Sequence, residues 1–204
     1  GSGLGDDIYN GGSGTDTLKY TSATAGITVD LLRGKATSTA GNDKAKIGND
    51  TITSIENLIA GYHSDHLVGT NGSNSIQALS GNDQIYAALG NDTINGGSGR
   101  DTAIFSSRKN RINLNTSKWQ NTGDDKDRLI SIENVNAGGG NDVVTGNKAA
   151  NTLNGQNGND VLYGQLGNDV VNGGAGRDTA VFSGRNNLIN LNTTQWQNTG
   201  DGRD

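Results

Sequence analysis

The feature that most constrains this chain is a nine-residue period that keeps one phase through three separate runs. Twelve units fall at residues 2–19, 60–104 and 137–181. The clearest unit, residues 173–181, reads Gly-Gly-Ala-Gly-Arg-Asp-Thr-Ala-Val, so three turn glycines precede a carboxylate and a short apolar stretch. A fixed internal period of this kind indicates a solenoid, in which each unit buries its apolar face by stacking on another.

The sixth position of the unit carries a carboxylate or an amide, and the eighth carries an apolar side chain. Six turn residues followed by three strand residues make half a coil, so two units should close one circuit. Side chains of every second unit then lie on the same edge, about 4.8 Å apart at strand spacing. The sixth-position residues are Asp7, Asp16, Asp65, Asn74, Asp83, Asp92, Asp101, Asp142, Asn151, Asp160, Asp169 and Asp178.

Stacked turns of this composition predict cation sites. The fourth position is glycine in most units, which suits a backbone with positive φ that turns its carbonyl towards an ion. Calcium binds about six to eight oxygen ligands, and such turns supply carboxylates and carbonyls without nitrogen or sulfur. Magnesium fits less well, because it demands near-ideal octahedral geometry.

Amides interrupt the carboxylate series within each long run. Asn74 precedes Asp92 in one run, and Asn151 precedes Asp169 in the other, whereas the alternate units of both runs carry only Asp. Because an amide adds no charge, the edge that carries these asparagines is expected to hold calcium weakly or not at all. Ala149 occupies a fourth position, where positive φ would cost energy.

Composition sets the limits within which these repeats must fold. The 204 residues carry a net charge of −5, only 30% are hydrophobic, and 33 are glycine. Composition alone suggests a disordered polypeptide, which suits a calcium-free state. The absence of Cys excludes disulfides and thiolate ligands, no apolar window is long enough to span a membrane, and the acidic balance argues against nucleic-acid binding.

A larger repeat encloses the small one. Residues 100–127 recur nearly unchanged at 177–204, a shift of 77. In the segments between runs, apolar residues alternate as in half-buried strands, and no segment predicts a helix. The chain is expected to be cut from a longer tandem protein. Its predicted divisions are a partial array at 1–19, a connector at 20–59, an array at 60–104, a connector at 105–136, an array at 137–181 and a truncated connector at 182–204.

The three runs resemble the haemolysin-type, or RTX, calcium-binding repeats. The resemblance implies an all-β fold, a right-handed parallel β-roll whose arrays are joined by irregular strand-containing connectors. It also implies several calcium ions between successive turns. The implied ligands are the carboxylates of Asp7, Asp16, Asp65, Asp83, Asp92, Asp101, Asp142, Asp160, Asp169 and Asp178, with carbonyls at Gly81, Gly90, Gly99, Gly158, Gly167 and Gly176.

Family members are exported, commonly by type I secretion, and fold in calcium-rich surroundings. The resemblance therefore implies a secreted, extracellular or cell-surface location, with the type I secretion machinery as a partner. Some units depart from the family pattern, which leaves their sites open. The departures are His63 and Ala149 at position four, and Thr70, Leu79, Ala88, Asn147, Gln156 and Gln165 at position two.

Other residues invite competing interpretations. His63 and His66 could bind a transition metal beside Asp65, but we favour solvent-facing turn residues. The equivalent Trp119 and Trp196 could stack on a sugar, although a plug over the end of a thin roll is the preferred interpretation. Glu56 and Glu133 have no partner carboxylate or nucleophile at a repeatable spacing, so catalysis within this segment is not expected.

The leading hypothesis is a calcium-binding structural region of a secreted protein, such as a rod, adhesin, layer or filament, that folds on binding calcium. Tandem modules extend a rod without adding chemistry. The alternative is a calcium-dependent export and folding region of a secreted enzyme, for example a protease, lipase or polysaccharide-modifying enzyme, whose catalytic domain lies elsewhere. A carbohydrate- or ice-binding surface ranks lower. Open solenoid ends also predict end-to-end self-association.

Overall fold

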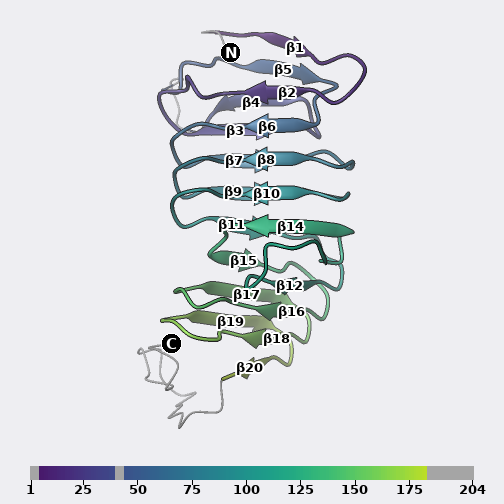
Figure 1. The fold of residues 1–204 in the computed structure, drawn as a ribbon, viewed down its shortest axis with the longest axis vertical. Helices are drawn as coiled ribbons and strands as arrows, with labels where there is room; N and C mark the ends of the chain where they lie inside the picture. The colour runs from purple at the N-terminus through teal and green to yellow at the C-terminus, as the bar shows by residue number, and fades with distance from the viewer. Residues whose placement is uncertain (1–4, 40–43, 183–204) are drawn as a thin grey trace.

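The computed structural model describes residues 5–39 and 44–182. Every regular element in these ranges is a β-strand, which confirms the all-β prediction. The strands stack along one long axis, with β1 (Ile8–Asn10) and β20 (Thr179–Val181) at opposite ends (Figure 1). No helix in the described ranges is long and apolar enough to cross a membrane.

One face of the stack, here called the first face, is a ten-stranded sheet. Its strands follow the long axis without interruption. In sheet order they are β1, β5 (Asp50–Thr53), β4 (Lys35–Ser38), β3 (Ile27–Asp30), β7 (His66–Val68), β9 (Gln84–Tyr86), β11 (Thr102–Ile104), β15 (Asn134–Asn136), β17 (Thr152–Asn157) and β19 (Val170–Ala175).

The second face consists of a six-stranded and a four-stranded sheet. The six-stranded sheet contains β13 (Gln120–Asn121), β14 (Lys126–Ile130), β10 (Thr93–Asn95), β8 (Ser75–Gln77), β6 (Asn57–Ile59) and β2 (Thr17–Lys19). The four-stranded sheet continues along the axis with β12 (Arg111–Asn113), β16 (Val143–Thr145), β18 (Val161–Tyr163) and β20.

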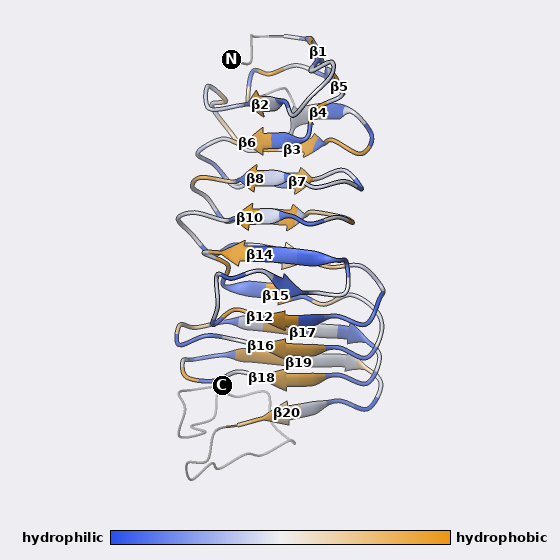
Figure 2. Ribbon diagram, turned by 45° about the vertical axis from the view of Figure 1, so that its right-hand side comes forward, coloured by the Kyte–Doolittle hydropathy of each residue, from blue (hydrophilic) through white to orange (hydrophobic). Residues whose placement is uncertain are grey.

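The strand register confirms that two units close one circuit. Leu67 pairs with Ile85 on the first face, and Ile76 pairs with Ile94 on the second, both in parallel. These eighth-position side chains are almost completely buried between the faces. Figure 2 shows the apolar colour on strands such as β6, β16 and β18, whereas β14 is mostly polar. In the arrays, about one apolar residue per strand, with some turn alanines, makes the core, which explains how so little hydrophobic sequence suffices.

Each connector turns back within one face. In the first, β3, β4 and β5 are antiparallel neighbours, so that β5 pairs with β1 while β3 pairs with β7. In the second, β14 pairs with β10 and β12 pairs with β16, with β13 between them. The strands expected in the connectors are thus present. The run at 2–19 gains its stacking neighbours, β5 and β6, from the first connector.

The faces are exchanged between modules. β7 and β16 are equivalent under the 77-residue shift, yet β7 lies in the first face and β16 in the second. The reason is that the chain changes face an odd number of times between them: β7 to β11 alternate between the faces, β12, β13 and β14 together occupy one position on the second face, and β15 returns to the first. The next array therefore begins half a circuit out of step. Asn74 and Asn151 consequently lie on opposite edges of the roll, and their expected placement on a shared edge is wrong.

Short turns close the roll where the connectors join the arrays. Residues 54–56 and 131–133, both Ser-Ile-Glu, replace six-residue turns, and Ile55 and Ile132 are buried in the core. Trp119 does not plug an end of the roll, because it lies 54% exposed between β12 and β13. Trp196 and the predicted connector at 182–204, beyond its first residue, lie outside the described residues.

Candidate metal sites

The sixth-position carboxylates form hydrogen-bonded ladders along both edges of the roll. Along these ladders, Oδ1 of an aspartate accepts the backbone N–H of the sixth-position residue one circuit earlier, as at Asp83, Asp92, Asp101, Asp160, Asp169 and Asp178. The donor–acceptor distances are 2.7 Å from Asp65 to Asp83, 2.9 Å from Asp83 to Asp101 and 2.8 Å from Asp142 to Asp160. The carboxylate thus holds the stacked turns in register and leaves its second oxygen for another partner.

Four acidic residues of the connectors, which the repeat pattern did not predict as site residues, continue these ladders. They accept N–H groups from the neighbouring array turns at 2.9–3.0 Å, in the same way as the repeat aspartates. The signal was present in the sequence, because residues 50–57 and 127–134 share the same acidic positions. These residues are Asp50, Glu56, Asp127 and Glu133.

The second oxygen of many repeat aspartates is buried without a hydrogen-bond partner. A buried anionic oxygen costs free energy unless a cation, a proton or a donor compensates it. The arrangement therefore fits a bound cation at each of these oxygens. The atoms are Oδ2 of Asp16, Asp83, Asp92, Asp101, Asp142 and Asp160.

Electrostatics favour the same conclusion. Burial raises the pKa of Asp83 and Asp92 to about 7, and that of Asp142 to about 6. Neighbouring carboxylates add to the effect, since Asp65 and Asp101 both raise the pKa of Asp83. The carboxylates stacked along one edge lie in a low-dielectric environment and repel one another. Cations between the turns would replace this repulsion with attraction.

The first glycine of two turns lies where a carboxylate oxygen and a carbonyl oxygen approach each other. A Cβ on Gly155 would lie 2.1 Å from Oδ2 of Asp160 and 2.7 Å from the carbonyl oxygen of Gly173, in the next circuit. A Cβ on Gly96 would similarly meet Oδ2 of Asp101 and the carbonyl oxygen of Ser131. A carboxylate and a carbonyl from different parts of the stack thus converge at these two turns, and hard oxygen donors of this kind suit calcium.

The predicted carbonyl ligands have the expected backbone. The fourth-position glycines have φ between 120° and 136° at Gly81, Gly90, Gly158, Gly167 and Gly176, and 141° at Gly99. Among the described residues, no three His, Cys, Asp or Glu side chains gather in one place, and His63 and His66 form no such group beside Asp65. A cation here would therefore depend on backbone carbonyls together with few carboxylates.

Three predicted ligands, Asp7, Asp65 and Asp178, differ from the buried carboxylates above. Asp65 accepts N–H groups at both oxygens, from Ile27 and Gly61. Asp7 accepts the Tyr9 hydroxyl at Oδ2. Asp169 and Asp178 hold the N–H groups of the preceding circuit, as the other ladder aspartates do, and Asp178 lies at the less buried end of the stack.

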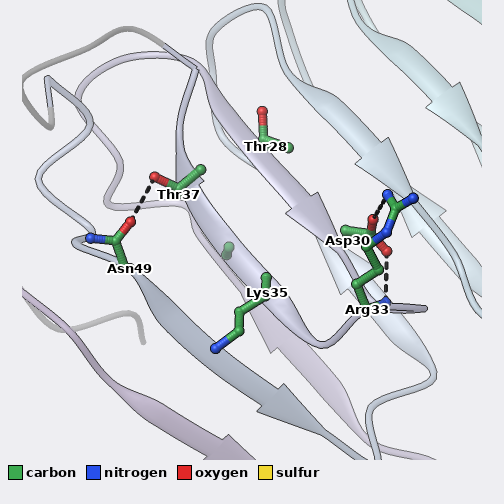
Figure 3. Close-up of a pocket in the computed structure, with 7 residues that line it drawn as sticks. Thr28, Asp30, Arg33, Lys35, Thr37 and Asn49 are labelled. Atoms are coloured by element: carbon green, nitrogen blue, oxygen red, sulfur yellow. Dashed lines mark hydrogen bonds and ion pairs between the residues drawn. The ribbon is translucent and has the colours of Figure 1, made fainter.

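A shallow pocket lies apart from the turns, on the first connector. Thr28, Asp30, Lys35, Thr37 and Asn49 line it, together with Arg33. Figure 3 shows two pairs among its polar groups: Arg33 forms an ion pair with Asp30, and Thr37 donates to Asn49. The pocket therefore lacks the unpartnered buried oxygens that distinguish the turns.

The pKa shifts predict an unusual pH dependence for the calcium-free fold. The folded pKa of Asp83 and Asp92, about 7, lies above the value of about 3.9 for an exposed aspartate. The folded chain thus holds protons that the unfolded chain releases, so these groups destabilise the fold as pH rises from about 4 to about 7.

We therefore expect more strand structure near pH 5 than near pH 8 when calcium is absent. Far-UV circular dichroism across this range in calcium-free buffer measures it. The calcium-loaded chain is the control and should show the reverse trend, because protons compete with calcium at the same oxygens. A calcium-free signal that does not change with pH would contradict the burial of these carboxylates.

Comparison with known proteins agrees with this geometry. The family description "RTX calcium-binding nonapeptide repeat (4 copies)" matches residues 2–18, 60–103, 132–160 and 145–180, which together cover more than half of the chain. The matched stretches contain the turns whose aspartate Oδ2 atoms are buried without a hydrogen-bond partner. No curated protein matches the chain.

Proposed function

Because this chain belongs to the RTX calcium-binding nonapeptide repeat family, we propose that it is a structural segment of a secreted protein that calcium makes rigid. The repeats bind calcium, and the fold is a parallel β-roll. The observation that carries the proposal is the set of buried Oδ2 atoms without partners at the turns. Calcium there would couple each circuit to the next, so that binding energy becomes folding energy.

The connectors support a rod in particular. The ten-stranded sheet passes through both connectors without interruption, and the acidic ladders continue into Asp50, Glu56, Asp127 and Glu133. A module boundary is therefore no break in the stack. Repetition of the 77-residue module would lengthen such a rod while keeping its cross-section, as expected for a stalk, adhesin, layer or filament.

The proposed location is outside the cell, at its surface or beyond. Millimolar extracellular calcium suits sites built from carbonyls and few carboxylates, whereas cytosolic calcium would leave them empty. Export in a calcium-free, unfolded state would suit the type I secretion machinery. The export and folding region of a secreted enzyme remains the second candidate, and a non-repetitive catalytic domain in the full-length protein would favour it.

Small-angle X-ray scattering tests the rod. In calcium we expect a rigid particle whose described part extends about 45 Å, from ten strands at about 4.8 Å each. If the open ends stack, the maximum dimension should grow with protein concentration while the cross-section stays constant. In chelator the scattering should become that of a flexible coil. A compact particle, or growth in cross-section, would argue against a rod.

A further inference from the structure

The six-residue turns of the arrays adopt two distinct backbone conformations. In the turn at 78–83, the second and fourth residues both have positive φ, 73° at Leu79 and 134° at Gly81. The turns at 11–16, 87–92, 96–101, 137–142, 155–160, 164–169 and 173–178 share this feature. We call these turns open. In the turns at 60–65, 69–74 and 146–151, neither position has positive φ, and we call these closed.

The two conformations treat the sixth side chain differently. In closed turns the N–H of the second residue donates to that side chain, at 2.9 Å from Gly61 to Asp65 and 2.7 Å from Thr70 to Asn74. The turn at 146–151 repeats this contact between its own second and sixth residues. In open turns the carboxylate lacks this donor, and Oδ2 of Asp83 is buried without a partner.

The asparagines complete the closed turns with hydrogen bonds alone. Nδ2 of Asn74 donates to the carbonyl of Glu56 at 2.7 Å, and Nδ2 of Asn151 donates to the carbonyl of Glu133 at 2.9 Å. The amide thus links the turn to the circuit before it without a cation. In the third closed turn, Asp65 performs the same task by accepting the N–H of Ile27.

The fourth residue accounts for two of the three closed turns. His63 and Ala149 carry a Cβ, which disfavours the positive φ that the open conformation needs. Gly140, the equivalent of His63 in the next module, has φ of 105°, and its turn is open. Gly72 is a glycine in a closed turn, and there the amide of Asn74 accompanies the closed state.

We propose that turn conformation decides calcium binding within this chain, with glycine at position four and aspartate at position six required for an occupied turn. The inference rests on the calcium binding proposed above. Open turns take calcium, and the turns at 60–65, 69–74 and 146–151 take none. These closed turns bond to connector residues Ile27, Glu56 and Glu133. At these three contacts, hydrogen bonds join the array to the connector without calcium, whereas the open turns at 87–92 and 96–101 meet the connector through Asp127 and Glu133.

The internal repeat supplies a reciprocal test. His63→Gly gives the 60–65 turn the glycine that its equivalent has at Gly140, so we expect the full chain to bind one more calcium ion. Gly140→His should close the 137–142 turn and remove one ion. The matched control is His66→Val, which introduces the residue of the second module without touching the turn. Calorimetric titration with calcium chloride counts the ions.

A second measurement does not depend on the count. The Gly61 amide should be protected from hydrogen exchange in the wild type, since it donates to Asp65, and should lose that protection in His63→Gly. If Gly140→His does not fold, Gly140→Ala replaces it, and His63→Gly stands by itself as a gain of binding. If the wild type binds calcium but His63→Gly binds no more ions than the wild type, this inference is wrong and the proposed function still stands. A wild type that binds no calcium overturns the proposed function.

Discussion

In chelator the chain will lose most of its strand structure, and calcium at about 0.1–10 mM will restore it. The core contains about one apolar side chain per strand, which offsets only a small part of the entropy of ordering so many glycines. Buried carboxylates such as Asp83 and Asp92 oppose the fold unless a cation compensates them.

Far-UV circular dichroism during a calcium titration measures this transition. The midpoint should lie in the extracellular range of concentrations, and magnesium at the same concentrations is the control, which should restore little structure. The closed turns and connectors should contribute what little strand signal survives in chelator. A complete strand spectrum without calcium at neutral pH would show that the thin core suffices by itself, and the idea of calcium-driven folding would fail.

The second large effect is expected from removing one ladder carboxylate. Asp160→Ala deletes an Oδ1 that holds the N–H of Asp142 and an Oδ2 that faces the carbonyl of Gly173. We expect it to lower the number of bound calcium ions by at least one and to reduce cooperativity, because neighbouring circuits share the ladder. Calorimetric titration gives both quantities, and Asp83→Ala is the equivalent test in the other array.

Asn151→Ala is the matched comparison, because Asn151 lies in the same array but in a closed turn. The ion count should not change. The free energy of unfolding of the calcium-loaded chain should instead fall by about 1–3 kcal/mol, since the substitution removes hydrogen bonds and leaves the carbonyl of Glu133 without its amide donor. Equal losses of calcium in Asp160→Ala and Asn151→Ala would contradict the distinction between open and closed turns.

Much of the architecture could be predicted because the repeat is local and strictly phased. Six turn residues and three strand residues define half a circuit, so the pairing of Leu67 with Ile85 follows from counting. The carboxylate at position six and the glycine at position four indicated a hard cation before any geometry was known. Asp160 and Gly158 lie where that reasoning placed them, at a turn stacked against its neighbours.

The connectors were less predictable, because their strands pair according to which neighbours remain free. Glu56 and Glu133 looked like isolated acids, and only the short Ser-Ile-Glu turns bring them into the ladders. The reversal of β12, β13 and β14 within one face likewise depends on pairing with β10 and β16. No pattern within a single unit predicts that the second long array starts on the opposite face from the first.

The sequence by itself determined the coil, the thin core and the cation chemistry, since each depends on residues within one nine-residue unit. Only the tertiary structure decided which edge carries each amide, how the connectors complete the ladders and which turns are open. His63 and Ala149 were visible as departures from the pattern, but their effect was not. A Cβ at position four can either strain the turn or be accommodated by the closed conformation. The outcome depends on hydrogen-bond partners in the preceding circuit, and these come from residues distant in the chain.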